Sequence, residues 1–126
     1  MFAYITLGTN DIARAARFYD AVMDVLGYAR LTTIPTELGY GLPGGNCQLW
    51  VNTPFDRNSA TVGNGSMPCF NAATRKMVDA FHATGLAQGG SDEGAPGLRS
   101  YEADFYACYL RDPDGNKLSA VCIGPE

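Results

Sequence analysis

The sequence has a single histidine among its 126 residues, and its four cysteines, at positions 47, 69, 108 and 122, form no CxxC pair. Histidines and paired cysteines are the usual ligands of structural zinc, so a zinc module is not expected. The cysteines all lie in strand-like segments, which favours buried free thiols over disulfides, and Cys69 is expected to be structural rather than nucleophilic. His82 falls in a helical segment and has no reason to meet Ser119, so no Ser-His-Asp triad is expected either.

Charged residues are also scarce, at 17%, and the net charge is −4. Nucleic acids and anionic membranes favour clustered basic side chains, so neither is an expected partner. The longest apolar stretches are well short of the roughly 20 residues of a membrane helix, and the N-terminus lacks the pattern of a secretion signal. We therefore expect a cytoplasmic protein, with residues 1–126 forming one domain.

Hydrophobic periodicity in the first half of the chain predicts one strand, one helix and a group of short strands. The strand covers residues 2–8, and an amphipathic helix follows over residues 9–27. Short strands separated by prolines and glycines are expected between residues 28 and 52. The polar, glycine-containing segment 53–66 is predicted to connect this half to the next.

The second half repeats the same order of elements. A strand is predicted at 67–73, a helix from about Thr74, and closing strands at 104–111 and 116–123. Each half thus consists of a strand, a helix and two or three further strands. A duplicated βαβββ unit is the simplest interpretation, although the halves share a pattern rather than residues.

Two segments carry a resemblance to a known superfamily. "LGTNDIARAARFYDAVMDVLGY" and "FYACYLRDPDGNKLSAVC" resemble the vicinal oxygen chelate superfamily of glyoxalases, bleomycin resistance proteins and extradiol dioxygenases. The helix ending and the DPDGN turn are the most specific parts, and the resemblance covers nearly the whole chain. It implies an α+β fold of two βαβββ modules, about residues 1–55 and 65–126, in an open cup-like mixed sheet with helices on the convex face. Small members are usually homodimers, so a homodimer is expected.

Enzymes of this superfamily hold a divalent metal ion that acts as a Lewis acid. The resemblance places the metal-ligand positions at Tyr4, Leu49, Met67 and Ser119. None of these is a customary ligand of a hard cation, so no metal or other cofactor is expected. Pro68 makes the third position uncertain by one residue, with Ser66 as its alternative. A divalent metal held by relocated acids, Glu102 and Asp104, is the competing hypothesis.

Strand alternation predicts which side chains line the concave face of the cup. They are Tyr4, Thr6, Met67, Cys69, Tyr109 and Ser119. Phenol, thioether and hydroxyl groups suit a small, partly apolar organic ligand. Trp50 is expected to point toward the helix instead, while glycine-rich segments 41–45 and 94–98 are expected to form flexible loops at the rim.

Three further polar residues have simpler interpretations than a role in a site. His82 follows an inward-facing Phe and is expected to be partly exposed on the helix surface. Asp112 and Asp114 are expected to shape the turn, with Asp112 accepting hydrogen bonds from the local backbone.

The missing metal ligands favour one of two functions. The first is a glyoxalase/bleomycin-resistance-like protein with a degenerate metal site, which binds a small organic molecule in the concave cup without metal. The alternative is a lyase, isomerase or dioxygenase of the same superfamily with relocated ligands, or with metal-free chemistry that uses Tyr4 and Tyr109. The acidic net charge of −4 would suit a cationic antibiotic, but mild acidity is too common to discriminate.

Overall fold

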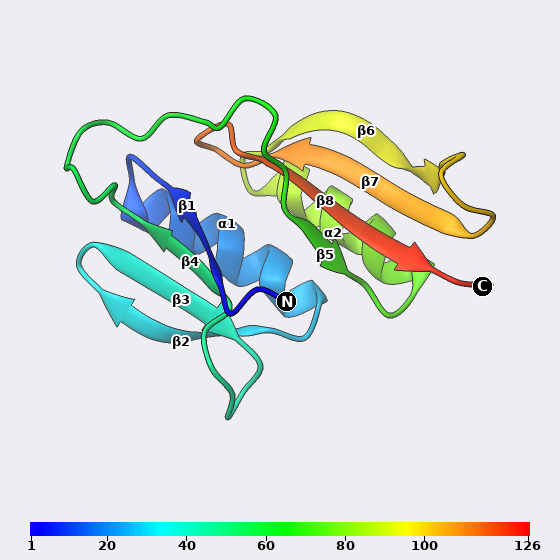
Figure 1. Ribbon diagram of the computed structural model, residues 1–126, viewed down its shortest axis with the longest axis horizontal. Helices are drawn as coiled ribbons and strands as arrows, with labels where there is room; N and C mark the ends of the chain where they lie inside the picture. The colour runs from blue at the N-terminus through cyan, green and yellow to red at the C-terminus, as the bar shows by residue number, and fades with distance from the viewer.

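The computed structural model describes all residues from 1 to 126, which form two modules of the same topology (Figure 1). Module one contains β1 (Ile5–Gly8), α1 (Ile12–Val25), β2 (Ala29–Ile34), β3 (Glu37–Gly41) and β4 (Leu49–Asn52). Module two contains β5 (Cys69–Asn71), α2 (Arg75–Ala87), β6 (Ser91–Leu98), β7 (Phe105–Arg111) and β8 (Lys117–Ile123). The predicted α+β fold with two βαβββ modules is confirmed.

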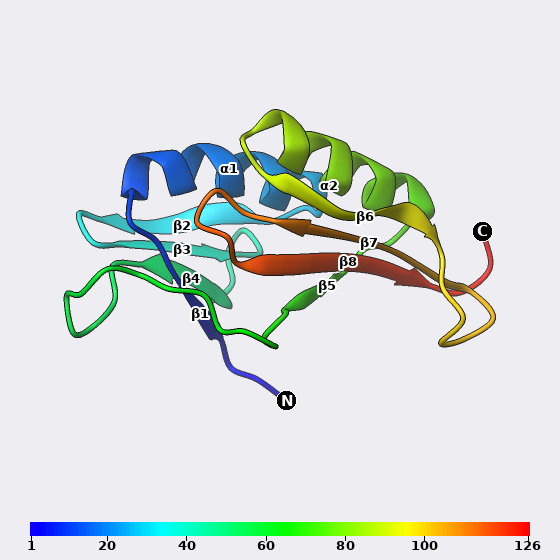
Figure 2. The same cartoon turned by 90° about the horizontal axis from the view of Figure 1, so that it is seen from above.

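Each module has its own four-stranded mixed sheet. The strand orders are β1-β4-β3-β2 and β5-β8-β7-β6. In each sheet the two strands that come first and last in the chain, β1 with β4 and β5 with β8, are neighbours and run parallel. Both helices cover the same side of the two sheets (Figure 2). The uncovered side of each sheet is called its concave face below. Neither helix has the length and apolar character needed to cross a bilayer.

One hydrophobic core of 17 buried residues extends through both modules, between the helices and the sheets. The helices approach each other closely where Phe18 of α1 lies near Gly85 of α2. A Cβ atom at Gly85 would lie 2.2 Å from Leu110 and 3.5 Å from Phe18. Glycine weakens a helix by about 1 kcal/mol relative to alanine, and here it permits a contact that no other residue would.

The turn between β7 and β8 is built around the buried carboxylate of Asp112. Its Oδ1 accepts hydrogen bonds from the backbone N–H groups of Asp114 (3.0 Å) and Asn116 (2.9 Å), which confirms the predicted role in the turn. Gly115 supplies the positive φ of 93° that the turn requires. The hydroxyl of Tyr19, on α1, donates to the other oxygen of Asp112. Burial raises the pKa of Asp112, and these hydrogen bonds oppose that effect only in part.

The same turn also fastens module two to module one, which the sequence did not indicate. Asp114, whose side chain is 4% exposed, accepts hydrogen bonds from the Thr9 hydroxyl (2.6 Å), the Asn10 N–H (2.9 Å) and the Arg14 guanidinium (2.7 Å). These three groups lie at the N-terminal end of α1. The turn therefore joins the two modules as well as two strands.

The prediction that residues 94–98 form a rim loop is wrong, because they belong to β6. The pairing of β6 with β7 shifts register around Gly94 and again before Gly97. Glycine and proline made this segment look like a loop, and they are accommodated here at bulges in an edge strand.

His82 is also placed differently from its prediction, since it is buried with 8% exposure. Its Nε2 lies 2.8 Å from Oδ1 of Asp92, at the start of β6. The strand that was taken for a loop covers this part of α2, and so the histidine is enclosed.

Candidate functional site

A hollow of about 710 Å³ lies on the concave face of module two and is called the module-two hollow below. Four of the six predicted ligand-binding residues line it. They are Met67, Cys69, Tyr109 and Ser119. Because β5, β8 and β7 are neighbouring strands, their concave-facing side chains meet at this point.

Ser119 forms the floor of the module-two hollow. In the sheet it is paired with Cys69 of β5 and with Tyr109 of β7, and it is only 1% exposed. Its hydroxyl oxygen has no hydrogen-bond partner in the protein. A buried polar atom without a partner costs about 1–3 kcal/mol and is rare in folded proteins. The hydroxyl is therefore an unpaired polar group buried beneath the floor of the hollow.

Cys69 stands beside Ser119 but does not satisfy its hydroxyl. Desolvation of the sulfur raises the pKa of the Cys69 thiol, although the residue as a whole is exposed, and the neighbouring Ser119 hydroxyl lowers it by a smaller amount from outside hydrogen-bond geometry. The thiol thus stays protonated at neutral pH. The prediction of buried cysteines holds for Cys108 and Cys122, but it is wrong for Cys69, which is exposed, and for Cys47, which is half-buried.

The ring of Tyr109 lies over Gly94 of the neighbouring strand. A Cβ atom at Gly94 would lie 2.9 Å from Cδ2 of Tyr109. Two cations lie against the same ring, with Arg99 at 5.2 Å and Lys117 at 5.8 Å from its centroid. Desolvation raises the pKa of Tyr109, so its hydroxyl remains neutral at neutral pH.

The register of the strands identifies the module-one counterpart of Ser119. In module one the N–H directly after β1 donates to the carbonyl of Asn52, which is paired with the last residue of β1. In module two the N–H directly after β5 donates to the carbonyl of Val121, which is paired with the last residue of β5. The residues two positions before these carbonyls are Trp50 and Ser119. Trp50 is paired with Thr6, as Ser119 is paired with Cys69.

This register corrects two predictions for module one. Leu49, placed at a ligand position on the concave face, is 4% exposed and belongs to the core on the helix side. Trp50, expected in that core, lies on the concave face across Gly39, where an added Cβ atom would be 2.7 Å from its ring. The prediction for these two residues was thus one position out of register, which exchanges the faces of a strand.

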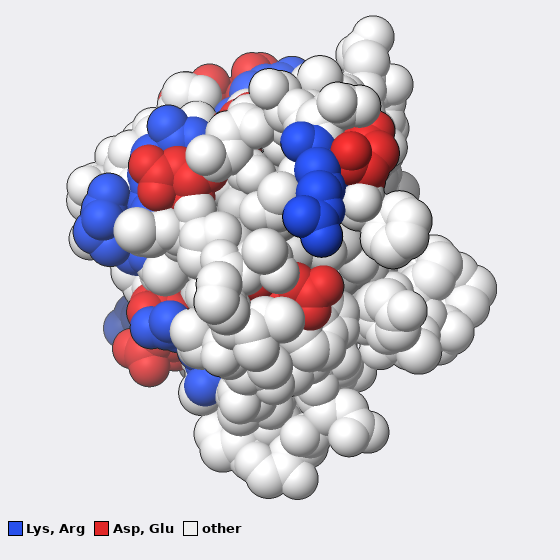
Figure 3. All heavy atoms as spheres, turned by 90° about the vertical axis from the view of Figure 1, so that its left-hand side faces the viewer, with Lys and Arg blue, Asp and Glu red and all other residues white.

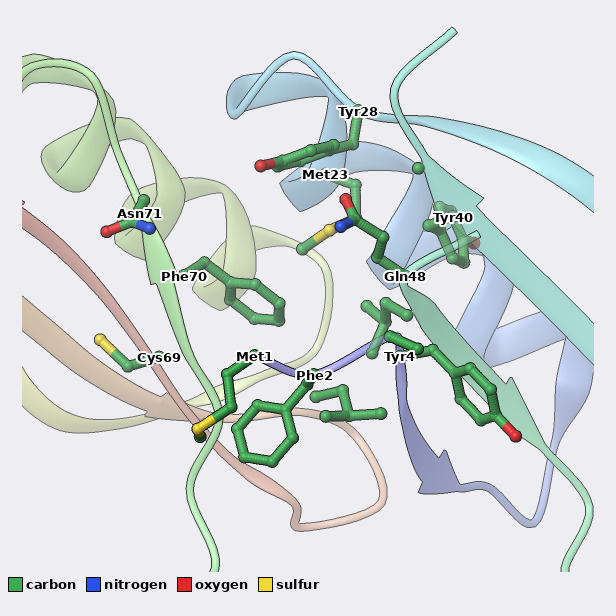
Figure 4. A pocket seen from close by; sticks show the side chains of 14 residues that line it. Met1, Phe2, Tyr4, Met23, Tyr28, Tyr40, Gln48, Cys69, Phe70 and Asn71 are labelled. Carbon is green, nitrogen blue, oxygen red and sulfur yellow. The ribbon is translucent and has the colours of Figure 1, made fainter. Parts of the chain in front are cut away.

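Tyr4 and Thr6 line two other hollows. Tyr4 is 59% exposed and borders a cleft of about 320 Å³ between the modules, which is lined mostly by apolar side chains. In Figure 4 its ring extends away from Cys69 and Phe70, which lie across that cleft. Thr6 faces a different, smaller hollow together with Ser66. The six predicted residues therefore do not form one site.

The residues present do not fit a divalent metal ion on either concave face. No three His, Cys, Asp or Glu side chains lie close enough together to hold one. The proposed relocated acids are also misplaced, since neither Glu102 nor Asp104 lines the module-two hollow. Asp104 instead lies 3.4 Å from Arg75 of α2.

Sequence patterns did not predict most of the wall of the module-two hollow. The side chains without a prediction are Glu93, Arg99, Tyr101 and Phe105. Lys117 also lines the hollow, and alternation along β8 places it on the same face as Ser119. The others lie on β6, on the loop after it and at the start of β7, and no periodicity marks them because β6 is bulged.

Solved structures match the chain over almost its entire length. A crystal structure of a glyoxalase/bleomycin resistance protein from Albidiferax ferrireducens T118 is 39% identical, with a TM-score of 0.87 and 99% of both chains covered.

Two further structures share the fold at lower identity. A glyoxalase-related enzyme from Fulvimarina pelagi is 22% identical, with a TM-score of 0.76 and coverage of 97% of this chain and 87% of that one. A glyoxalase/bleomycin resistance protein/dioxygenase family enzyme from Burkholderia phytofirmans PsJN is 23% identical, with a TM-score of 0.74 and coverage of 97% and 98%. No protein-family model and no curated protein matches the chain.

Proposed function

Because this chain belongs to the glyoxalase/bleomycin resistance protein family, we propose that it binds a small organic molecule in the module-two hollow without a metal ion. The observation that carries this proposal is the Ser119 hydroxyl, which is buried at the floor of the hollow without a hydrogen-bond partner. A ligand that bonds to this oxygen removes the cost of leaving it unpaired.

The wall of the hollow suits the apolar part of such a ligand. Tyr101 and Phe105 pack edge to face, with their ring centroids 5.2 Å apart, and present aromatic surface next to Tyr109. Aromatic walls with a few fixed polar groups are typical of sites for small molecules. Met67 adds a flexible, polarisable side chain at the edge, where it is 38% exposed.

Binding is proposed rather than catalysis because no side chain in the hollow is activated. The pKa values of the Cys69 thiol and the Tyr109 hydroxyl are both raised, chiefly by desolvation, so each remains protonated at neutral pH. No histidine lies nearby to act as a base, because His82 is occupied by Asp92 on the other side of the sheet. The donor set for a metal ion is also missing.

We also propose that the protein is a homodimer. Large apolar side chains are exposed at Met1 (111%), Phe2 (72%) and Phe55 (104%), which is unfavourable for an isolated chain. Light scattering during size exclusion should give twice the chain mass, and Phe2→Ser should shift the equilibrium toward a single chain. A single-chain mass at all concentrations would contradict this proposal.

The test of metal-free binding begins with elemental analysis. Protein purified without chelator is incubated with Mn, Fe, Ni, Zn and Cu, passed through a desalting column and analysed, alongside Ser119→Glu. We expect near-zero metal in the parent, and more in the variant, which restores a carboxylate at a family ligand position. One tightly held ion per parent chain would contradict the proposal.

Ligand occupancy is tested on the same preparation. Native mass spectrometry, followed by denaturation, should release an organic molecule from the parent chain, or a fragment screen should find compounds that bind it. The matched variant is Ser119→Trp, which introduces the tryptophan that module one has at the equivalent position. Binding that is unchanged in this variant would place the ligand elsewhere.

A further inference from the structure

The charges of the module-two hollow are unbalanced. Glu93, its one acidic residue, is paired with Arg111 at 2.7 Å. Arg99 and Lys117 have no acidic partner, and the side chain of Lys117 makes no hydrogen bond within the protein. Two positive charges therefore line the hollow without an acidic partner.

The bulged strand β6 holds the guanidinium of Arg99 in place. Its Nη2 donates to the carbonyl of Ala95 at 2.6 Å, while an added Cβ atom at Gly94 or Gly97 would lie within 3.3 Å of the guanidinium nitrogens. The glycines thus let the side chain lie close against the backbone. A planar guanidinium fixed in this way keeps N–H groups free for a second partner, since it has five donors.

Tyr109 lies next to the second cation as well. Arg99 and Lys117 lie 5.2 Å and 5.8 Å from its ring centroid, and they come from the two sides of β7, on the loop after β6 and on β8. An oxyanion beside the ring would be attracted by both charges.

We infer that the ligand of the module-two hollow is a flat organic oxyanion, with a carboxylate or phosphate group at Arg99 and Lys117 and an aromatic body against Tyr101 and Phe105. The Ser119 hydroxyl donates a hydrogen bond to the same molecule from the floor. This inference rests on the proposed function and adds the chemical class of the ligand.

The local charge is opposite to that of the whole chain, which carries −4. Figure 3 shows acidic and basic side chains lying next to one another at the module-one end, and the ion pair of Arg30 with Asp20 (2.9 Å) follows that mixed pattern. In the module-two hollow the cations lack such partners. The hollow therefore disfavours a cationic ligand, although the net charge alone would have suited one.

Four naphthalene probes with different charges test the inference. Isothermal titration of the full chain compares 2-naphthoate and 2-naphthyl phosphate with neutral 2-naphthamide and cationic 2-naphthylmethylamine. We expect the better oxyanion to bind at least about tenfold more tightly than the amide, and its affinity to fall as salt is raised from about 50 to about 500 mM. The stronger of the two oxyanions identifies carboxylate or phosphate as the preferred group.

Variants locate the charge effect. Arg99→Gln and Lys117→Gln should each weaken oxyanion binding, by about tenfold for Arg99, and leave amide binding unchanged. Lys76→Gln is the matched control, because it removes an exposed cation from α2 on the opposite side of the sheet. The affinity of the Lys76→Gln variant for the oxyanions should equal that of the parent at the same ionic strength.

Two results would overturn the inference. If the amide binds as tightly as the oxyanions and Ser119→Trp abolishes both, the hollow binds ligands but does not select anions, and the proposed function stands alone. If no probe binds at millimolar concentration, the assigned ligand class is wrong, and the occupancy measurement above decides the proposed function separately.

Discussion

The concave faces of the two modules have the same strand register but differ in where one aromatic ring lies. In module one Trp50 lies across Gly39, its partner on the neighbouring strand. In module two the aromatic residue is Tyr109 and the small one is Ser119, and the ring lies over Gly94 of the next strand. The aromatic ring thus lies on a different strand in each module. A hollow can form in one half of a duplicated fold without any change of backbone topology.

The turns that precede the last strand of each module differ in a similar way. Residues 42–46 of module one are exposed, and their side chains make no hydrogen bond. The counterpart in module two, residues 112–116, holds both its own backbone and the N-terminal end of α1. One turn is a surface connection, and the other fixes the position of module two against module one.

The largest effect is expected from removing the connection between the modules. Asp114→Ala should lower the free energy of unfolding by about 2–4 kcal/mol, because it leaves three donors of module one without their buried acceptor. Asn46→Ala, in the module-one turn, should change it by less than about 0.5 kcal/mol. Urea denaturation measures both. Equal losses would show that the two turns are equivalent after all.

A matched pair of glycine substitutions separates the two concave faces. Gly39→Ala should destabilise the chain by about 1–3 kcal/mol and shift the emission of Trp50, the single tryptophan, because an added Cβ atom would lie 2.7 Å from its ring. Gly94→Ala should cost less, since its closest contact with Tyr109 is 2.9 Å, and leave that emission unchanged.

The same pair should have the opposite order of effect on binding. Gly94→Ala pushes Tyr109 over Ser119 and should weaken 2-naphthoate binding more strongly than Gly39→Ala does. If the order is reversed in titration calorimetry, the ligand lies in module one.

Removing the unpaired hydroxyl should separate stability from binding. Ser119→Ala deletes a buried oxygen without a partner, so the free energy of unfolding should stay the same or rise by up to about 1 kcal/mol, while 2-naphthoate binds more weakly. Ser66→Ala, at an exposed serine outside the module-two hollow, is the control and should alter neither quantity. A marked loss of stability in Ser119→Ala would mean that the hydroxyl is already satisfied.

The smallest effect concerns the pH dependence contributed by Asp112. Burial raises its pKa in the folded chain, so the folded state holds this proton more tightly than the unfolded state. Its contribution to stability is therefore greatest below about pH 4, the unfolded pKa, and falls as pH rises through the folded value. The free energy of unfolding of the parent minus that of Asp112→Asn should therefore fall from pH 4 to pH 7. A value that rises over this range would contradict the raised pKa.

Local patterns in the sequence predicted the elements that depend on local chemistry. Helical spacing predicted both helices, and DPDGN predicted the turn, because caps, periodicity and turn residues act within a few positions of one another. Alternation along β8 also placed Ser119 correctly on the concave face. The glycines and proline of β6 are typical of a loop, so this strand was not predicted.

The site itself depends on contacts between distant residues and was predicted only in part. Trp50 was assigned to the wrong face because the register of β4 is set by pairing with β1 and β3, not by its own four residues. The ring of Tyr109 lies against Gly94 in the wall of the hollow, and nothing near Tyr109 in the sequence marks that contact.

The decisive experiment is a nuclear magnetic resonance titration of the ¹⁵N-labelled chain with 2-naphthoate in the presence of EDTA. We expect saturable shifts at the amides of Gly94, Tyr109 and Ser119, with no shift of the Trp50 indole. Shifts that cluster around Trp50 or the inter-module cleft, or binding that appears only when a divalent metal replaces EDTA, would contradict this expectation.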